Sequence, residues 1–161
     1  MELIKASFEK KMILRNLMEL YQYDMSQFED ASENDVNEYG LFDYKYLDHY
    51  WTEEGRFPFF IMESGKMAGF ALVRKIADDE SPKFSIAEFF ILRKYRGQGI
   101  GKEVAHKVFG MFKGNWSVSW LDKNLPAKIF WKKAIIEYSD GKCSESVQAG
   151  NPSLEFISRY C

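Results

Sequence analysis

The spacing of apolar residues along the chain changes near residue 58. Before that point, apolar side chains recur at the spacing of a helix face over residues 8–23, and a second helix is indicated over 43–53. After it come short apolar runs separated by polar turns, which is typical of strands, while two later stretches return to helical spacing. We therefore predict helices first, then a strand meander, then alternating helices and strands.

The predicted elements define a fold class. Helices are expected over 8–23, 43–53, 100–112 and 126–138. Strands are expected over 2–5, 59–63, 67–76, 84–92, 116–121, 143–148 and 154–160, with a polar loop over 25–40. This order predicts an α/β protein of the α+β-like kind, in which helices flank a mixed, mostly antiparallel sheet. The length of 161 residues suits a single domain over 1–161.

Composition narrows the range of partners. No apolar stretch is long enough to cross a membrane, and the N-terminal residues lack the apolar core of a signal peptide. Cys143 and Cys161 form no disulfide framework, and with His49 and His106 they lack the usual spacing of a metal site. The net charge of −2 argues against nucleic acid as the main partner. We expect a cytoplasmic protein with no metal, no nucleic-acid partner and no membrane partner.

Charge is unevenly distributed along the chain. Residues 24–54 contain ten acidic residues and a single base, Lys45, so this segment carries −9 and the rest of the chain +7. Rings are interspersed with the carboxylates: Tyr39, Phe42, Tyr44, Tyr46, Tyr50 and Trp51. Carboxylates and rings together suit an ammonium ligand, and the basic half suits an anionic cofactor. A solvated acidic loop and ordinary core packing of the second helix are the alternatives.

The glycine-rich stretch from Arg96 to Gly101 lies between a predicted strand and a predicted helix. Glycines allow a sharp turn and a close approach of a ligand to the backbone. The unpaired N–H groups at the start of the helix then favour a phosphate or pyrophosphate. The spacing fits neither a nucleotide P-loop nor a dinucleotide-binding turn. A turn that needs glycine only for its geometry is the alternative reading of this segment.

Two segments carry a family resemblance. Arg96, Gly99 and Gly101 match the Arg/Gln-x-x-Gly-x-Gly/Ala pyrophosphate loop of the GNAT superfamily of acyl-CoA-dependent N-acyltransferases. Downstream, Asn124, Ala127 and Phe130 resemble the Asn-x-x-Ala-x-x-Phe-Tyr segment of that family. The resemblance implies the GNAT fold, acetyl-CoA as co-substrate and acetyl transfer to an amine.

The resemblance also implies which residues bind the cofactor. Backbone amides of the turn would hold the pyrophosphate: Gly97, Gln98, Gly99, Ile100 and Gly101. Arg96 and Lys102 would be nearby cations. A backbone amide of the preceding strand, within Phe90, Ile91 and Leu92, would polarise the thioester carbonyl, while Asn124 and Phe130 would lie beside the pantetheine arm.

Glu88 is the candidate general base. It is the one carboxylate in an otherwise apolar predicted strand, and burial would raise its pKa toward the working range of a base. The alternative is a structural carboxylate that faces solvent or pairs with a cation. The tyrosine that often acts as general acid in relatives is replaced by Trp131, whose indole N–H has no useful acidity. Another group or solvent must then protonate the thiolate; Tyr138 fits better as a core residue.

These observations predict an N-acetyltransferase that moves the acetyl group from acetyl-CoA to a small cationic primary amine by direct attack. A non-catalytic acyl-CoA-binding sensor and a protein N-acetyltransferase are the alternatives. The partner expected is a small-molecule amine; homodimer formation and the identity of the amine stay open.

Overall fold

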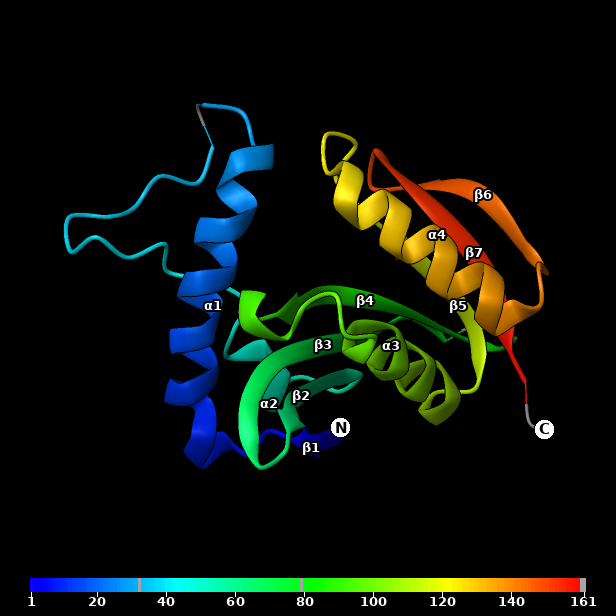
Figure 1. Ribbon diagram of the computed structural model, residues 1–161, viewed down its shortest axis with the longest axis horizontal. Coiled ribbons are helices and arrows are strands. Elements are labelled where there is room, and N and C mark those ends of the chain that lie inside the picture. Colours follow the sequence, from blue (N-terminus) through cyan, green and yellow to red (C-terminus); the bar gives the residue numbers. More distant parts are fainter. Residues whose placement is uncertain (32, 79, 160–161) are drawn as a thin grey trace.

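A seven-stranded sheet with the strand order β1-β2-β3-β4-β5-β7-β6 forms the centre of the molecule (Figure 1). The computed structural model describes residues 1–31, 33–78 and 80–159. The strands are β1 (Glu2–Lys5), β2 (Arg56–Glu63), β3 (Lys66–Asp78), β4 (Pro82–Ile91), β5 (Gly114–Ser119), β6 (Cys143–Gln148) and β7 (Asn151–Ser158). The helices are α1 (Lys11–Met25), α2 (His49–Thr52), α3 (Ile100–Met111) and α4 (Leu125–Ser139), with short 3-10 turns at Phe8–Lys10, Ser26–Phe28 and Arg93–Tyr95. The structure confirms the predicted mixed sheet flanked by helices.

The junction between β4 and β5 has the shortest register in the sheet. Every other neighbouring pair is antiparallel, whereas β4 and β5 run parallel and α3 lies between them in the chain. Their register covers two residue pairs, Lys83 with Asn115 and Phe84 with Trp116. Beyond Phe84 the strands diverge, so the edge of β4 is left without a strand partner on that side. This divergence creates the cleft in which the site lies.

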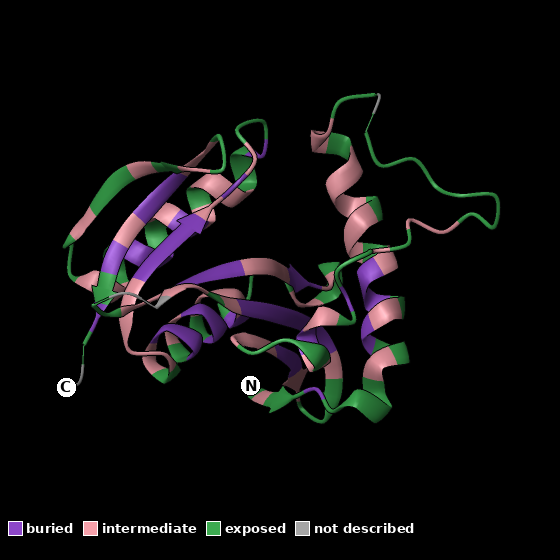
Figure 2. Ribbon diagram, turned by 180° about the vertical axis from the view of Figure 1, so that it is seen from behind, coloured by how far each residue is buried: buried purple, intermediate pink, exposed green. Residues whose placement is uncertain are grey.

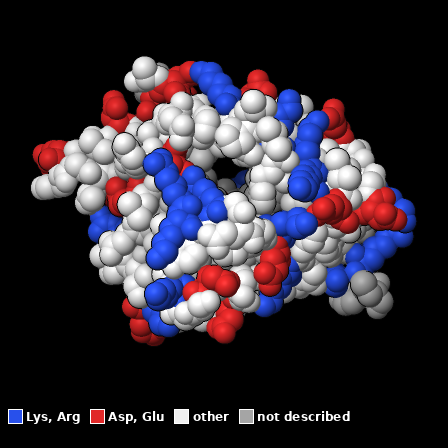
Figure 3. All heavy atoms as spheres, viewed as in Figure 1, with Lys and Arg blue, Asp and Glu red and all other residues white. Residues whose placement is uncertain are grey.

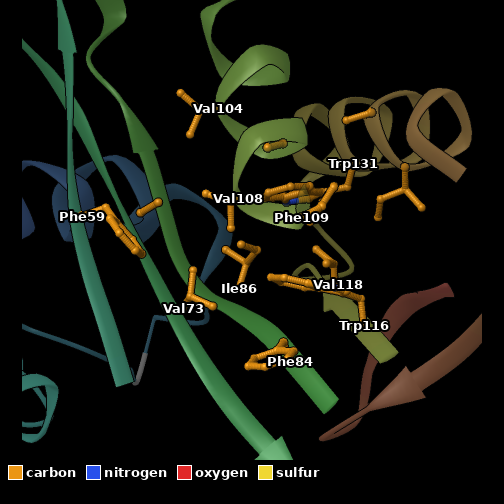
Figure 4. Packing of buried hydrophobic residues seen from close by; sticks show 14 of the residues in the cluster. Phe59, Val73, Phe84, Ile86, Val104, Val108, Phe109, Trp116, Val118 and Trp131 are labelled. Atoms are coloured by element: carbon orange, nitrogen blue, oxygen red, sulfur yellow. The ribbon is translucent and has the colours of Figure 1, made fainter. Parts of the chain in front are cut away.

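Two hydrophobic cores lie on the two faces of the sheet. Alternate residues of β2 and β3 point to opposite faces, so Phe59 and Val73 pack with α3 and α4, whereas Phe60 and Leu72 pack with α1 and α2. Figure 2 shows buried residues along the central strands and on the inner face of each long helix. The larger core is rich in rings, and Figure 4 shows Phe109 and Trp131 close together within it. Such packing fixes the helices whose first turns reach the cleft.

The predicted helix over 43–53 is wrong for most of its length. α2 covers only His49–Thr52, and turns with i to i+3 hydrogen bonds precede it. Asp43 has a positive φ of 58°, which no right-handed helix accommodates. Leu47 and Tyr50 are nevertheless buried in the core, so the apolar pattern reported burial and not helical backbone. The other predicted elements are present with ends shifted by at most three residues; the starts of α1, β2 and β7 each move by three. The predicted end of the last strand at Tyr160 lies outside the described residues.

Candidate active site

The cleft between β4 and β5 exposes backbone groups of β4. The Leu92 N–H donates to the Ala68 carbonyl of β3 at 2.8 Å. Since backbone groups alternate sides along a strand, the Phe90 amide also points toward β3, whereas the amides of Phe89 and Ile91 face the cleft. Among the three residues predicted to polarise the thioester carbonyl, only Ile91 therefore presents its amide to the cleft. Phe89 joins it as a candidate that the sequence did not reveal.

The glycine turn leads into an uncapped helix. Gly97 and Gly99 have φ values of 73° and 81°, and Gly99 is the N-cap residue of α3. A Cβ added at either glycine would meet no atom within 4 Å, so both face open space. No side chain caps the helix, which leaves its first N–H groups for a ligand. Gly101 serves packing instead, since a Cβ there would lie 3.1 Å from the Phe130 ring.

The cations beside the turn are already engaged with protein groups. Arg96 donates through Nε to the Ile91 carbonyl at 2.7 Å and through a terminal nitrogen to Asp24 at 2.7 Å. Arg93 donates to the same Asp24 carboxylate, which holds the pKa of Asp24 below its usual range despite burial. Lys102 forms an ion pair with Glu137 at 2.9 Å. Asp24 belongs to the acidic segment, so that segment reaches the basic turn and is not a separate lobe. Figure 3 shows Lys and Arg side chains gathered beside a hollow at the centre of this face.

A cavity of about 700 Å³ connects the turn with α1 and α4. Its wall includes Gly97, Gly99, Gly101, Arg96, Lys102, Phe89, Phe90, Ile91, Asn124 and Phe130. The Asn124 Oδ1 caps α4 by accepting the Ala127 N–H at 3.0 Å, and its Nδ2 contacts the Met25 sulfur. Phe130 stacks on Phe89 with ring centres 5.6 Å apart. The uncapped amides and the cations fit the phosphates of a phosphorylated thioester donor, and the apolar channel fits its apolar arm.

The remaining predicted residues have other side-chain roles. The Leu92 amide is paired with β3, and its side chain packs against the core near α1. Ile100 is buried in the core of α3 and α4, so only its backbone could reach a ligand. The Gln98 side chain donates to the Lys94 carbonyl at 2.9 Å. The structure thus brings most of the predicted cofactor-binding residues to one cavity, whereas Leu92, Gln98 and Ile100 do not line it.

A second cavity of about 560 Å³ adjoins the first. Six residues line both cavities: Tyr21, Met25, Phe89, Asn124, Ala127 and Trp131. The second cavity is bounded by rings, by three carboxylate residues, Glu29, Asp43 and Glu88, and by one lysine, Lys45. Within the described residues, Gln22 Oε1 and Trp120 Nε1 are buried in this region without a hydrogen-bond partner. An acidic, ring-lined cavity next to the predicted donor channel is a suitable place for a cationic acceptor.

Glu88 lines the second cavity, beside Phe89 and Tyr21, which line both cavities. Register pairs jump from Leu72–Glu88 to Val73–Ile86, so Ala87 is the extra residue of a β-bulge beside Glu88. The carboxylate accepts hydrogen bonds from the hydroxyls of Tyr21 and Tyr44, the latter at 3.1 Å. Burial raises the pKa of the Glu88 carboxyl, although these two hydrogen bonds oppose the rise. A carboxylate with a raised pKa in the wall of this cavity can accept a proton from an amine.

The rings of Trp131 and Tyr138 both pack against other aromatic rings. Trp131 is 5% exposed and packs edge-on against Phe89 and Phe130 at 5.0 and 4.8 Å. The Tyr138 hydroxyl shares a 2.8 Å hydrogen bond with Ser158 Oγ, and its ring packs on Phe109. Tyr138 lines neither of the two cavities, in agreement with its interpretation as a core residue. The free Cys143 lies on β6, at the edge of the sheet far along the order from β4.

Besides Phe89, the sequence does not indicate the roles of three further residues. Tyr21 lies within the predicted helix over 8–23, and Tyr44 is one of several rings in the acidic segment. Glu19 also lies within that helix, and its carboxylate accepts the backbone N–H groups of Phe42 and Asp43 at 2.8 and 3.2 Å. Glu19 thereby holds the loop that carries Tyr44. No local signal in the sequence joins residues that lie 23 to 67 positions apart along the chain.

Comparison with known proteins agrees with this geometry. The model of the acetyltransferase (GNAT) family matches residues 17–135, which is most of the chain. The chain therefore belongs to the GNAT acetyltransferase family, whose members transfer acyl groups from a CoA-type donor. No curated protein matches the chain.

Solved structures share the fold at low sequence identity. The PaiA N-acetyltransferase of Thermoplasma acidophilum, solved with coenzyme A, has a TM-score of 0.67 at 11% identity, covering 97% of this chain and 98% of its own. A GNAT acetyltransferase of Streptococcus agalactiae has a TM-score of 0.68 at 12% identity, covering 99% and 96%. A GNAT acetyltransferase of Staphylococcus aureus has a TM-score of 0.66 at 15% identity, covering 98% of this chain and 99% of its own.

Over residues 1–31, 33–78 and 80–159, no helix has the length and apolarity required to span a membrane. In the same described part of the chain, no group of three or more His, Cys, Asp or Glu residues is arranged to bind a metal ion.

Proposed function

We propose that this protein transfers the acetyl group of acetyl-CoA to the primary amine of a small cationic acceptor by direct attack. One observation carries the proposal: a glycine-turn cavity and an acidic, ring-lined cavity adjoin, and Glu88 lies in the wall of the second cavity, hydrogen-bonded to Tyr21, which lines both. A donor and an acceptor bound in the two cavities would meet beside a proton acceptor. Alignment of two reactants in this way is itself a large part of catalysis.

The donor is expected to bind along β4. The amides of the turn and of the first turn of α3 would hold the pyrophosphate, with Arg96 and Lys102 beside it. The amide of Phe89 or Ile91 would donate to the thioester oxygen as negative charge develops there. Neither amide has a strand partner across the cleft, since β4 and β5 pair only near Phe84.

The acceptor is expected to be a cation. Glu29, Asp43 and Glu88 supply negative charge, and the Gln22 Oε1 is a buried acceptor without a partner among the described residues. An ammonium group can pair with these carboxylates and can donate a hydrogen bond to the Gln22 Oε1. Glu88 would take the proton that the amine loses on attack.

Turnover with a panel of amines tests the proposal. Free CoA thiol should be released with small polyamines or diamines and not with neutral or anionic amines. Glu88→Gln should lower kcat/KM by about 10²-fold or more and remove the acidic limb of its pH profile. Calorimetry should show unchanged CoA binding in that variant, because Glu88 does not line the donor cavity.

Two other functions give different results. A non-catalytic acyl-CoA sensor would bind CoA in calorimetry and release no thiol with any amine; the absence of a tyrosine at position 131 favours it. A protein N-acetyltransferase would acetylate peptide amines in preference to the small-amine panel. The walls around Glu88, formed by α1, the loop before α2 and the β5 end, favour a small acceptor.

A further inference from the structure

The departing thiolate needs a proton donor that position 131 cannot supply. Trp131 is buried among Phe89, Phe109 and Phe130, and an indole N–H does not protonate a thiolate near neutral pH. A donor would have to reach the point where the two cavities meet, because the thioester bond breaks there if the proposed function holds. The acid must therefore lie in the wall that the two cavities share.

Only one side chain of that shared wall carries an ionisable proton. The described residues that line both cavities are Tyr21, Met25, Phe89, Asn124, Ala127 and Trp131. Of these, Tyr21 alone has a hydroxyl whose proton can be transferred. The residue as a whole is half-buried.

The Tyr21 ring is fixed on both sides. It meets Phe70 and Phe90 edge-on, with ring centres 5.6 and 5.7 Å away. Its hydroxyl donates to Glu88 Oε2, while Tyr44 donates to the other oxygen of the same carboxylate. The candidate base and the candidate acid are therefore directly hydrogen-bonded.

We propose that Tyr21 of α1 is the general acid of the acyl transfer and that it forms a proton relay with Glu88. This proposal rests on the proposed function. It assigns to α1, on the opposite face of the sheet from α4, the proton transfer that Trp131 on α4 cannot perform.

The protons balance without solvent. The amine nitrogen attacks the thioester carbon, a C–N bond forms and the carbonyl electron pair moves to oxygen. As that pair returns, the C–S bond breaks and sulfur leaves with its electron pair. Glu88 takes the proton from nitrogen, Tyr21 gives its hydroxyl proton to sulfur, and Tyr21 then regains a proton from Glu88. One proton has moved from nitrogen to sulfur, and both side chains are back in their starting forms.

The charges around Glu88 suit this order of events. The ionisable groups facing it are Tyr21 from α1, Glu29 and Tyr44 from the loop, Tyr50 from α2 and Arg74 from β3. Burial and the Glu88 carboxylate raise the pKa of Tyr21 well above its ordinary value, which keeps its proton in place at rest. Once Glu88 has accepted the amine proton, its negative charge no longer raises the pKa of Tyr21. Tyr21 then becomes a better acid.

A change of leaving group tests the acid role. Tyr21→Phe should lower kcat with acetyl-CoA by about 10²-fold and by much less with the selenoester analogue, because a selenolate is stable without a proton. Tyr44→Phe is the matched control: it removes the other hydrogen bond to Glu88, but Tyr44 lines only the acceptor cavity. Tyr44→Phe should lower kcat by the same factor with both donors. The acidic limb of its pH profile should move to higher pH.

Three outcomes would overturn the assignment. Equal losses of Tyr21→Phe with both donors would make Tyr21 a positioning residue, and a full rate would remove it from the mechanism; either leaves the proposed function intact. No turnover by the wild-type protein with any amine would remove the proposed function and the relay together. Calorimetry with CoA verifies that each variant is folded. If Tyr21→Phe does not fold, replacing Tyr21 with difluorotyrosine keeps the hydrogen bond and should move the alkaline limb to lower pH.

Discussion

A buried carboxylate is costly at the scale of a single residue, and Glu88 should affect stability accordingly. Its pKa is raised by burial in the folded protein, so the folded state holds the proton more tightly than the unfolded chain. The unfolding free energy therefore falls as the pH rises from the unfolded pKa through the folded pKa, and it stays lower above that window. Below the window, Glu88 makes no such contribution.

Glu88→Gln should therefore gain stability relative to wild type as the pH rises. Denaturant unfolding of both proteins at about pH 4 and pH 7 measures the difference, and a gain in the relative stability of the variant between these values is expected. A constant difference across the range would contradict a raised pKa. Glu145→Gln is a suitable control: Lys132 lowers the pKa of the exposed Glu145 carboxyl, so this substitution should have the opposite sign of pH dependence.

The sequence indicates Glu88 because a single charge between Ala87 and Phe89 is unusual in a buried strand. It does not indicate Tyr21 or Tyr44, since a tyrosine on an apolar helix face is ordinary and the partner carboxylate is 67 or 44 residues away. Hydrogen bonds between distant segments depend on the packing of α1 and of the loop, and no local pattern encodes them.

At the scale of elements, the effect of backbone strain at the glycine turn can be distinguished from the loss of ligand contact by comparing two substitutions. Gly97→Ala and Gly65→Ala both place a Cβ on a backbone with φ of 73°, and neither Cβ meets an atom within 4 Å. Each should cost about 1–2 kcal/mol of unfolding free energy. Only Gly97 faces the donor cavity, so only Gly97→Ala should also weaken CoA binding, by about tenfold. Calorimetry and denaturant unfolding decide this; equal CoA affinity in both variants would place the pyrophosphate elsewhere.

One carboxylate, that of Glu19, accepts two backbone N–H groups of the loop between α1 and α2. Glu19→Ala would remove the acceptor of the Phe42 and Asp43 N–H groups and release Tyr44 from Glu88. The KM for the amine should rise by about threefold to tenfold, since a charge-assisted hydrogen bond contributes about 1 kcal/mol or more, while CoA affinity stays unchanged. Steady-state kinetics beside calorimetry measures both. Glu2→Ala on β1 removes the same charge at an exposed position and should change neither.

Elements with regular spacing were predicted well, and the irregular ones were not. The strands around β4 and the helices α3 and α4 follow from alternation, glycine and the apolar stripe. The segment 43–53 has a helical stripe but is mostly turn, because Asp43 is in a left-handed conformation and the neighbouring N–H groups bond to Glu19. Here a tertiary contact outweighed local preference.

At the scale of the whole molecule, the sheet consists of two halves joined at one narrow place. β1 to β4 and β5 to β6 are connected by two residue pairs, and the amides of Phe89 and Ile91 face the cleft between the halves. A donor bound there would contact β4 and α3 on one side and α4 on the other. The sequence predicted both halves but not their divergence, which depends on where two distant strands stop pairing.

Hydrogen exchange should therefore slow at Phe89 and Ile91 when CoA is added, because a bound pantetheine arm would pair with amides that have no strand partner across the cleft. Thermal unfolding should rise in parallel, since a ligand at a hundred times its Kd adds about 2.7 kcal/mol. The β6–β7 hairpin at the far edge is the internal control, and its exchange should change little. Gly97→Ala should reduce both effects at the same CoA concentration. Protection spread evenly over the sheet, with none in excess at β4, would mean that the donor does not lie in this cleft.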